Sequence, residues 1–124
     1  MSDESVVWVI QEQPNLDYRQ AEPWGEVRFM TAREYKPLAH SLLNEEIKET
    51  VQNKVDTGFD PLRDWVVLTG NPVILGWAVH CLLEKAKRHN ETTTKEECEY
   101  LQLLQHDKHY GGYRETRLWL EPRT

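Results

Sequence analysis

The sequence predicts an α+β fold with one mixed sheet of about five strands, in the element order β-β-α-β-α-β-β. Two short runs, residues 6–10 and 66–68, are rich in β-branched residues and lack polar alternation, which is typical of buried strands. Residues 38–51 place apolar side chains at helical spacing, and residues 73–83 are almost continuously apolar. Near the C-terminus, Gly111-Gly112 separates two further β-forming runs and predicts a hairpin.

The central unit spans residues 64–88 and is predicted to be a strand, a tight turn and a helix. Asn71 suits the N-cap and Pro72 the first helical position, while the basic residues 85, 87 and 88 favour the C-terminal end of the helix dipole. A helix that is apolar on nearly every side needs two covered sides, so we expect Trp77 and Leu82 to be buried. Gly76 is costly inside a helix, which predicts a close backbone approach there.

The first half of the chain supplies two strands and one helix. Residues 6–10 are expected to form a central strand, residues 13–23 an irregular connection and residues 25–30 a half-exposed strand. A helix follows over residues 38–51, with Pro37 at its first position, and residues 56–63 form a turn-rich return to the sheet.

The second half continues with a polar loop over residues 89–97 and a strand over residues 99–105. A parallel β-α-β crossover over residues 66–104 is expected to be right-handed. After a hairpin over residues 106–112, a last strand over residues 113–120 places Tyr113, Arg117 and Trp119 on one face.

Composition limits the class of protein. The 124 residues are expected to form a single domain, residues 1–124. Residues 1–62 hold six Lys/Arg and twelve Asp/Glu and residues 63–124 hold nine of each, so the acidic balance disfavours duplex nucleic acid as a partner. The acidic N-terminus resembles no signal peptide, and the longest apolar run falls short of the ~20 residues that span a bilayer. We therefore expect a soluble, cytoplasmic protein without membrane contact, with Cys81 and Cys98 as reduced, buried thiols.

The order of these elements resembles small uncharacterised proteins of tailed bacteriophages. The shared pattern is an N-terminal strand (residues 6–12), an Asp-aromatic-apolar strand (64–70) and a Gly-Asn-Pro turn (70–72). An apolar helix (73–83) and a Leu-Leu-x-x-Asp strand (103–107) follow, with Tyr113 a few residues later. The resemblance implies a viral origin and an accessory role in the infected cell, and it carries over no catalytic residue.

The turn formed by Thr69, Gly70 and Asn71 is a candidate ligand site. This turn lies at a strand C-terminus and a helix N-terminus, where ligands bind in parallel sheets and backbone N–H groups favour anions. A lone glycine, the lack of a following lysine and the loss of one donor at Pro72 equally fit a capped helix end.

The sequence gives weaker signals for a metal site or a catalytic nucleophile. Residues 106–109 read His-Asp-Lys-His, but no cysteine lies at a ligand spacing, so we expect no metal and no cofactor. Cys81 and His80 are adjacent on a helix and point in different directions, which argues against a nucleophile pair. The sequence therefore favours a protein that is not an enzyme.

The aromatic and basic residues of the last strand suggest an interface. Tyr, Trp and Arg are favoured in hot spots between proteins and also stack on single-stranded nucleic acid, although an ordinary half-buried strand explains them too. We expect an interface formed by Trp77, Tyr113, Arg117 and Trp119.

These observations predict a non-enzymatic phage accessory module that self-associates and acts in the host cytoplasm, with a host or phage protein as a further partner. The alternative is a binder of an anionic or nucleotide ligand at residues 69–72. A third alternative is a hydrolase or nuclease whose site the sequence does not reveal.

Overall fold

The computed structural model describes residues 4–13, 15–31 and 41–122. It contains one five-stranded sheet in the order β2-β1-β3-β4-β5. The strands are β1 (Val6–Gln11), β2 (Glu26–Thr31), β3 (Trp65–Val67), β4 (Tyr100–Asp107) and β5 (Gly112–Trp119). Strand β1 pairs in parallel with β2 and β3, β3 pairs in parallel with β4, and β5 is antiparallel to β4. The predicted α+β class, the mixed sheet and the β-α-β crossover are confirmed.

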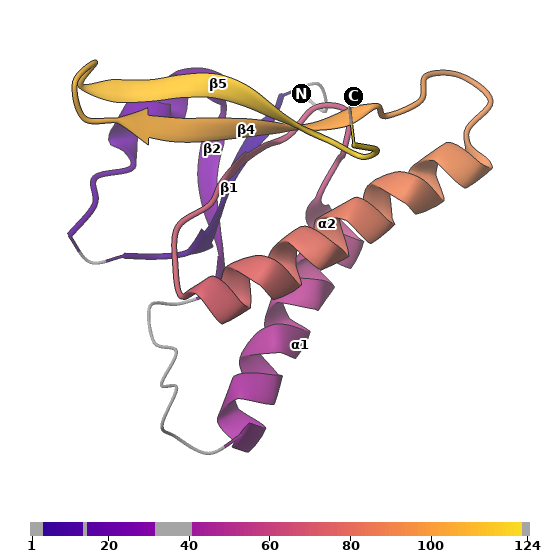
Figure 1. The fold of residues 1–124 in the computed structure, drawn as a ribbon, viewed down its shortest axis with the longest axis horizontal. Helices are drawn as coiled ribbons and strands as arrows, with labels where there is room; N and C mark the ends of the chain where they lie inside the picture. The colour runs from indigo at the N-terminus through magenta and orange to yellow at the C-terminus, as the bar shows by residue number, and fades with distance from the viewer. Residues whose placement is uncertain (1–3, 14, 32–40, 123–124) are drawn as a thin grey trace.

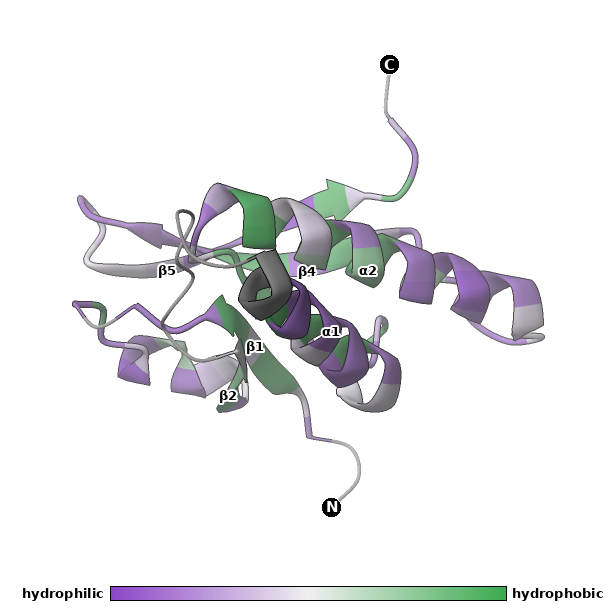
Figure 2. Ribbon diagram, turned by 90° about the horizontal axis from the view of Figure 1, so that it is seen from below, coloured by the Kyte–Doolittle hydropathy of each residue, from purple (hydrophilic) through white to green (hydrophobic). Residues whose placement is uncertain are grey.

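Both long helices, α1 (Ser41–Gly58) and α2 (Pro72–Thr92), lie together on one side of the sheet (Figures 1 and 2). The short 3-10 helix η1 (Arg19–Trp24) packs on the other side, where Ala21 and the neighbouring Tyr18 join a second apolar cluster. The alternation of β1 divides the core between these two sides. Trp8 and Ile10 face the helices, whereas Val7 and Val9 face η1.

The burial of β1 on both faces is confirmed, because Val7, Trp8, Val9 and Ile10 are all buried. Its central position follows from the same property, since a strand without a polar face needs a covering layer on each side. Among the described residues, no helix is long and apolar enough to cross a bilayer.

Several predicted boundaries were wrong. Helix α1 continues to Gly58 because Val55 extends the buried row of Val51 by one turn. Helix α2 continues to Thr92, through the first residues of the predicted 89–97 loop, and the irregular connection contains η1. Strand β3 ends at Val67, so Leu68 is an exposed apolar residue. The predicted helix start at Pro37 lies outside the described residues.

Helix α2 starts where the sequence predicts, but it packs differently from the prediction. The Asn71 side chain accepts a hydrogen bond from Val73 N at 2.8 Å, and Pro72 opens the helix, as predicted. Leu82 is fully buried, whereas Trp77 is only partly buried. The close approach predicted at Gly76 is wrong, because a Cβ there would meet no atom within 4 Å. The sheet and α1 cover one side of α2 and leave Val73, 52% exposed, on the other.

Candidate functional site

The sheet presents a group of aromatic side chains on the face opposite the long helices. We call Trp65, Tyr100, Arg117 and Trp119 the aromatic face. Three strands contribute to it, because the register places Tyr100 opposite Trp119 and Gln102 between Trp65 and Arg117. The Tyr100 and Trp119 rings contact edge to face with centroids 5.0 Å apart. Both rings are partly exposed, so this cluster is packed internally and still open to a partner.

Arg117 lies across these rings. Its guanidinium carbon is 4.6 Å from the Tyr100 ring centroid and 5.9 Å from that of Trp119. Stacking on aromatic rings holds the planar group in place while its side chain remains exposed. The face therefore combines rigid aromatic surface with one oriented positive charge.

The aromatic face is bordered by Trp24 and Glu115. The Trp24 indole N–H donates to Glu115 Oε2 at 2.8 Å, and the Trp24 and Trp65 rings are 6.5 Å apart. A shallow hollow of about 210 Å³ lies between β3, β4 and β5. Its lining includes Trp65, Tyr100, Gln102, Glu115 and Arg117. A negative and a positive side chain thus stand side by side at the edge strand β5.

The four predicted interface residues do not all meet. Arg117 and Trp119 lie together in the aromatic face, whereas Tyr113 is only 4% exposed and packs in the cluster beneath η1, where burial raises the pKa of its phenol. Trp77 lies on the opposite side of the sheet, where its indole N–H donates to Lys48 O at 2.9 Å and joins α2 to α1. Sequence reasoning missed Trp65 and Tyr100, whose participation depends on the order of strands in the sheet.

The Thr69–Asn71 turn is occupied by another part of the chain. The Gln11 side-chain oxygen accepts the Asn71 N–H at 2.8 Å, and Thr69 Oγ1 donates to Gln11 O at 3.0 Å. Gly70 has a φ of 137°, and a Cβ there would lie 2.7 Å from the Gln11 side chain. The Gln11 carboxamide therefore uses a backbone donor that an anion would need.

Thr69 nevertheless lines a cavity of about 420 Å³ at the carboxyl ends of β3 and β4. Most of its lining is apolar, and the polar groups among it include Gln105 and His106. Ligands bind at this end of parallel strands in open sheets. The cavity has room for a small, largely apolar molecule.

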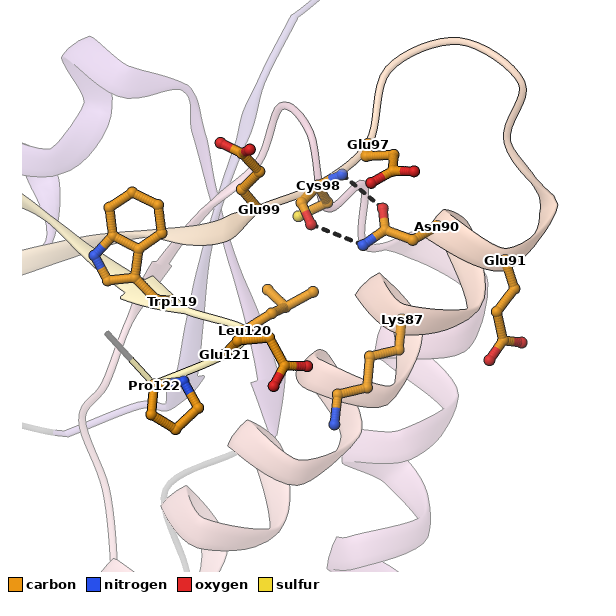
Figure 3. A pocket seen from close by; sticks show the side chains of 10 residues that line it. All are labelled: Lys87, Asn90, Glu91, Glu97, Cys98, Glu99, Trp119, Leu120, Glu121 and Pro122. Atoms are coloured by element: carbon orange, nitrogen blue, oxygen red, sulfur yellow. Dashed lines mark hydrogen bonds between the residues drawn. The ribbon is translucent and has the colours of Figure 1, made fainter. Parts of the chain in front are cut away.

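A third hollow, of about 510 Å³, lies between α2, the start of β4 and the end of β5 (Figure 3). Asn90 Nδ2 donates to Cys98 O at 2.8 Å, and Asn90 Oδ1 accepts Cys98 N–H at 2.6 Å. These two bonds satisfy both backbone groups of Cys98 and attach the segment that leads into β4 to the helix. Several carboxylates line the hollow together with Lys87. We interpret it as a structural junction.

The two cysteines are separate, buried thiols, as predicted. Burial is the largest influence on both and raises the pKa of the Cys81 and Cys98 thiols. The Cys98 thiol also donates toward Tyr100 O at 3.2 Å. Both groups are therefore protonated at neutral pH, which makes them poor nucleophiles.

The His-Asp-Lys-His segment spans the end of β4 and the first half of the β4–β5 turn. Asp107 Oδ1 accepts the N–H groups of His109 and Tyr110, and Asp107 Oδ2 lies 2.7 Å from Arg114 Nε. The bond from Tyr110 is the largest influence that holds the pKa of Asp107 below its ordinary value. Within residues 4–13, 15–31 and 41–122, no three His, Cys, Asp or Glu side chains are grouped so that they could hold a metal ion.

Comparison with protein-family models gives a match over most of the chain. The model of a family described as phage Pam3 gp32-like protein matches residues 5–120, nearly the whole chain. Comparisons with curated proteins and with solved structures find no match. The match confirms the resemblance to an uncharacterised phage protein family, and the chain belongs to the phage Pam3 gp32-like protein family.

Proposed function

We propose that this chain is a non-enzymatic phage accessory protein that binds other proteins and self-associates through the aromatic face and the adjoining strand β5. It acts in the cytoplasm of the infected host, and a host or phage protein is a further partner. The observation that carries this proposal is the stacked cluster of Trp65, Tyr100, Arg117 and Trp119 on the side of the sheet without long helices.

The cluster has the properties of an interface hot spot. Trp, Tyr and Arg dominate the binding energy of protein interfaces when they lie in a packed, central patch. Here the rings already hold one another, so binding a partner immobilises few additional side-chain rotations. Little of the binding free energy is therefore lost to fixing the side chains of the aromatic face.

The charges of this region favour a protein over a nucleic acid. Arg117 stands beside Glu115 on the same face of β5, and the whole chain carries a net charge of −6. A nucleic-acid surface instead needs an excess of basic groups to displace counterions. Opposite charges side by side are suited to a protein surface with the complementary arrangement.

The test is the molar mass in solution, measured by light scattering across a range of protein concentrations. We expect a species heavier than the 14.7 kDa single chain, and we expect Arg117→Ala to raise its dissociation constant by about tenfold. Lys87→Ala is the matched control, because Lys87 is an exposed basic residue on α2. A mass of one chain at every concentration would refute self-association.

The cavity beside Thr69 supports a second candidate function, the binding of a small molecule. A thermal-shift screen with a nucleotide panel and a panel of small apolar acids would test it. A ligand that binds the folded state raises the melting temperature with its concentration. Thr69→Val should reduce that shift, and a panel without any shift would eliminate this candidate.

A further inference from the structure

We infer that a second copy of this chain binds along the outer edge of β5 by antiparallel strand pairing, with the two-fold axis at Thr116. This inference rests on the proposed self-association and specifies its geometry. It follows from the hydrogen-bond pattern of β5 and from the positions of its charges.

Strand β5 ends the sheet. The strand order places β4 on one side of it, and no described strand pairs with the other side. All eight residues of β5 are in register with β4, so the strand is long and regular. An edge strand of this kind is a template for pairing with another chain.

The direction of each backbone group in β5 follows from one bond. Leu120 N donates to Glu99 O at 3.1 Å and continues the β4–β5 register by one pair beyond Tyr100 and Trp119. Hydrogen-bonded and non-hydrogen-bonded pairs alternate along an antiparallel ladder. The even-numbered residues of β5 therefore turn their N–H and C=O groups toward β4. The odd-numbered residues direct theirs outward, namely Tyr113, Glu115, Arg117 and Trp119.

In a symmetric antiparallel pair of β5 strands, residues whose backbone groups point outward must lie opposite each other in the two copies. This condition limits the possible registers to a few. A two-fold axis at Thr116 places Glu115 opposite the partner's Arg117 and Arg117 opposite the partner's Glu115, with both pairs hydrogen-bonded through the backbone. An axis at Glu115 would place two carboxylates opposite each other, and an axis at Arg117 two guanidinium groups. Opposite charges stabilise cross-strand pairs and like charges destabilise them. The charges thus select Thr116.

The same register agrees with the side chains on both faces. On the side of the sheet opposite the long helices, Glu115 and Arg117 of each copy meet across the axis, and Trp119 lies opposite the partner's Tyr113. On the other face, Thr116 meets the partner's Thr116 as a non-hydrogen-bonded pair, in which the side chains approach most closely. Cross-strand threonine pairs contribute to sheet stability. The two five-stranded sheets would form one continuous sheet.

Thr116→Cys tests this register directly. Opposite residues in a non-hydrogen-bonded antiparallel pair have Cα atoms about 4.5 Å apart, which is within the range of a disulfide. With oxidised glutathione as the oxidant, we expect a covalent dimer of Thr116→Cys on a non-reducing gel. Glu115→Cys and Arg117→Cys report the two competing registers, and Lys87→Cys is the exposed control on α2. Cys81 and Cys98 are buried and present in every variant, so any cross-linking through them is the same in all lanes of the gel.

Charge exchange gives an independent test in the native geometry. Glu115→Arg and Arg117→Glu should each weaken the dimer by about tenfold or more, because like charges then face each other. The double variant restores opposite charges across the axis, and its dissociation constant should return most of the way to that of the natural chain. Since Glu115 also accepts the Trp24 indole N–H, the recovery in the double variant separates pairing between copies from damage within one copy.

The outcomes are distinct. If the natural chain is monomeric by light scattering, both the proposed self-association and this inference fail. If it is an oligomer but Thr116→Cys does not cross-link in preference to the other three variants, the β5 register is wrong and self-association stands. Preferential cross-linking at Thr116 together with recovery in the double charge exchange supports the edge and its register.

Discussion

At the residue scale, Asp64 is the polar group that organises the helix side of the core. Its carboxylate is buried and accepts three hydrogen bonds, from Val6 N at 2.9 Å, Trp8 Nε1 at 3.0 Å and Asp60 N at 2.8 Å. These donors belong to the first strand and to the loop before β3. One side chain therefore fixes two segments that are more than fifty residues apart in the sequence.

Replacing Asp64 by alanine should lower the free energy of unfolding by about 2–4 kcal/mol, because it leaves three donors without their acceptor in a buried place. Urea denaturation followed by tryptophan fluorescence measures this loss. Asp56→Ala is the matched control: its ion pair with Arg88 is exposed, and its loss should cost less than about 1 kcal/mol. Equal effects of the two variants would contradict the organising role of Asp64.

The buried thiols make a second prediction at this scale. Because burial raises the pKa of Cys81 and Cys98, the folded protein should react slowly with a disulfide reagent at pH 8. Both thiols should react at once in strong denaturant. Fast labelling of either cysteine in the folded protein would show that its segment opens readily.

At the scale of elements, helix α2 is fixed in the fold by contacts on one side only. Its buried side carries Ile74, Ala78, Leu82 and Ala86, and Trp77 attaches it to α1. The opposite side includes Val73 and Gly76, both exposed. This uncovered side is apolar only in the first turns of the helix, because the exposed residues that follow include His80, Glu84 and Lys87.

Gly76→Ala should raise the free energy of unfolding by about 1 kcal/mol, because alanine is the better helix former and its Cβ meets no atom within 4 Å. Gly25→Ala is the matched control with the opposite sign. Gly25 has a φ of 153° and a Cβ there would lie 2.2 Å from Ser5 O, so this variant should lose stability. A loss at Gly76 would indicate that another surface packs on this side of α2.

The Asp107 carboxylate at the β4–β5 turn should make the stability of the fold depend on pH. The folded state lowers the pKa of Asp107 below its ordinary value of 3.8, so its contribution to stability is present above that value and is lost as the pH falls through the lower folded pKa. The urea midpoint of Asp107→Ala should therefore be lower than that of the natural chain at pH 7. The difference should vanish at a pH below the folded pKa of Asp107, where the carboxylate is protonated in both states. A difference that persists at that pH would point to packing rather than charge.

At the scale of the whole molecule, stability should be graded from the centre of the sheet to its edge. Strand β1 is paired on both sides and buried on both faces, whereas β5 is paired with β4 alone among the described strands. Amide groups in a doubly covered central strand exchange their hydrogens only through global unfolding. Edge amides that point outward exchange through much smaller openings.

Hydrogen exchange measured by NMR would reveal this gradient. We expect the slowest amides in β1, with protection close to the full free energy of unfolding. The amides of Glu115 and Arg117 should exchange fast at low protein concentration and slow down as the concentration rises, because pairing with a second copy would protect them. The Thr116 amide, which points toward β4, is the internal control and should change little.

The sequence alone determined the features that depend on neighbouring residues. The continuous apolar run of β1 predicts burial on both faces, and Asn71-Pro72 marks the start of α2 through local bonds within one helical turn. The alternation along β5 separates Arg117 and Trp119 from Leu118 because successive side chains of any strand point to opposite faces. The phage family was also visible in this local order of elements.

Only the tertiary structure decided which of these features meet. Trp65 and Tyr100 join Trp119 because β3, β4 and β5 are neighbours in the sheet, and no local pattern specifies that order. Gln11 reaches the N-terminus of α2 from a strand sixty residues earlier and occupies a donor that looked available for an anion. Gly76 is exposed because the sheet and α1 cover only one side of α2, although the first turns of this helix are apolar all round. Periodicity reports how many apolar residues a segment has and at what spacing, whereas the side that is covered depends on contacts between segments far apart in the chain.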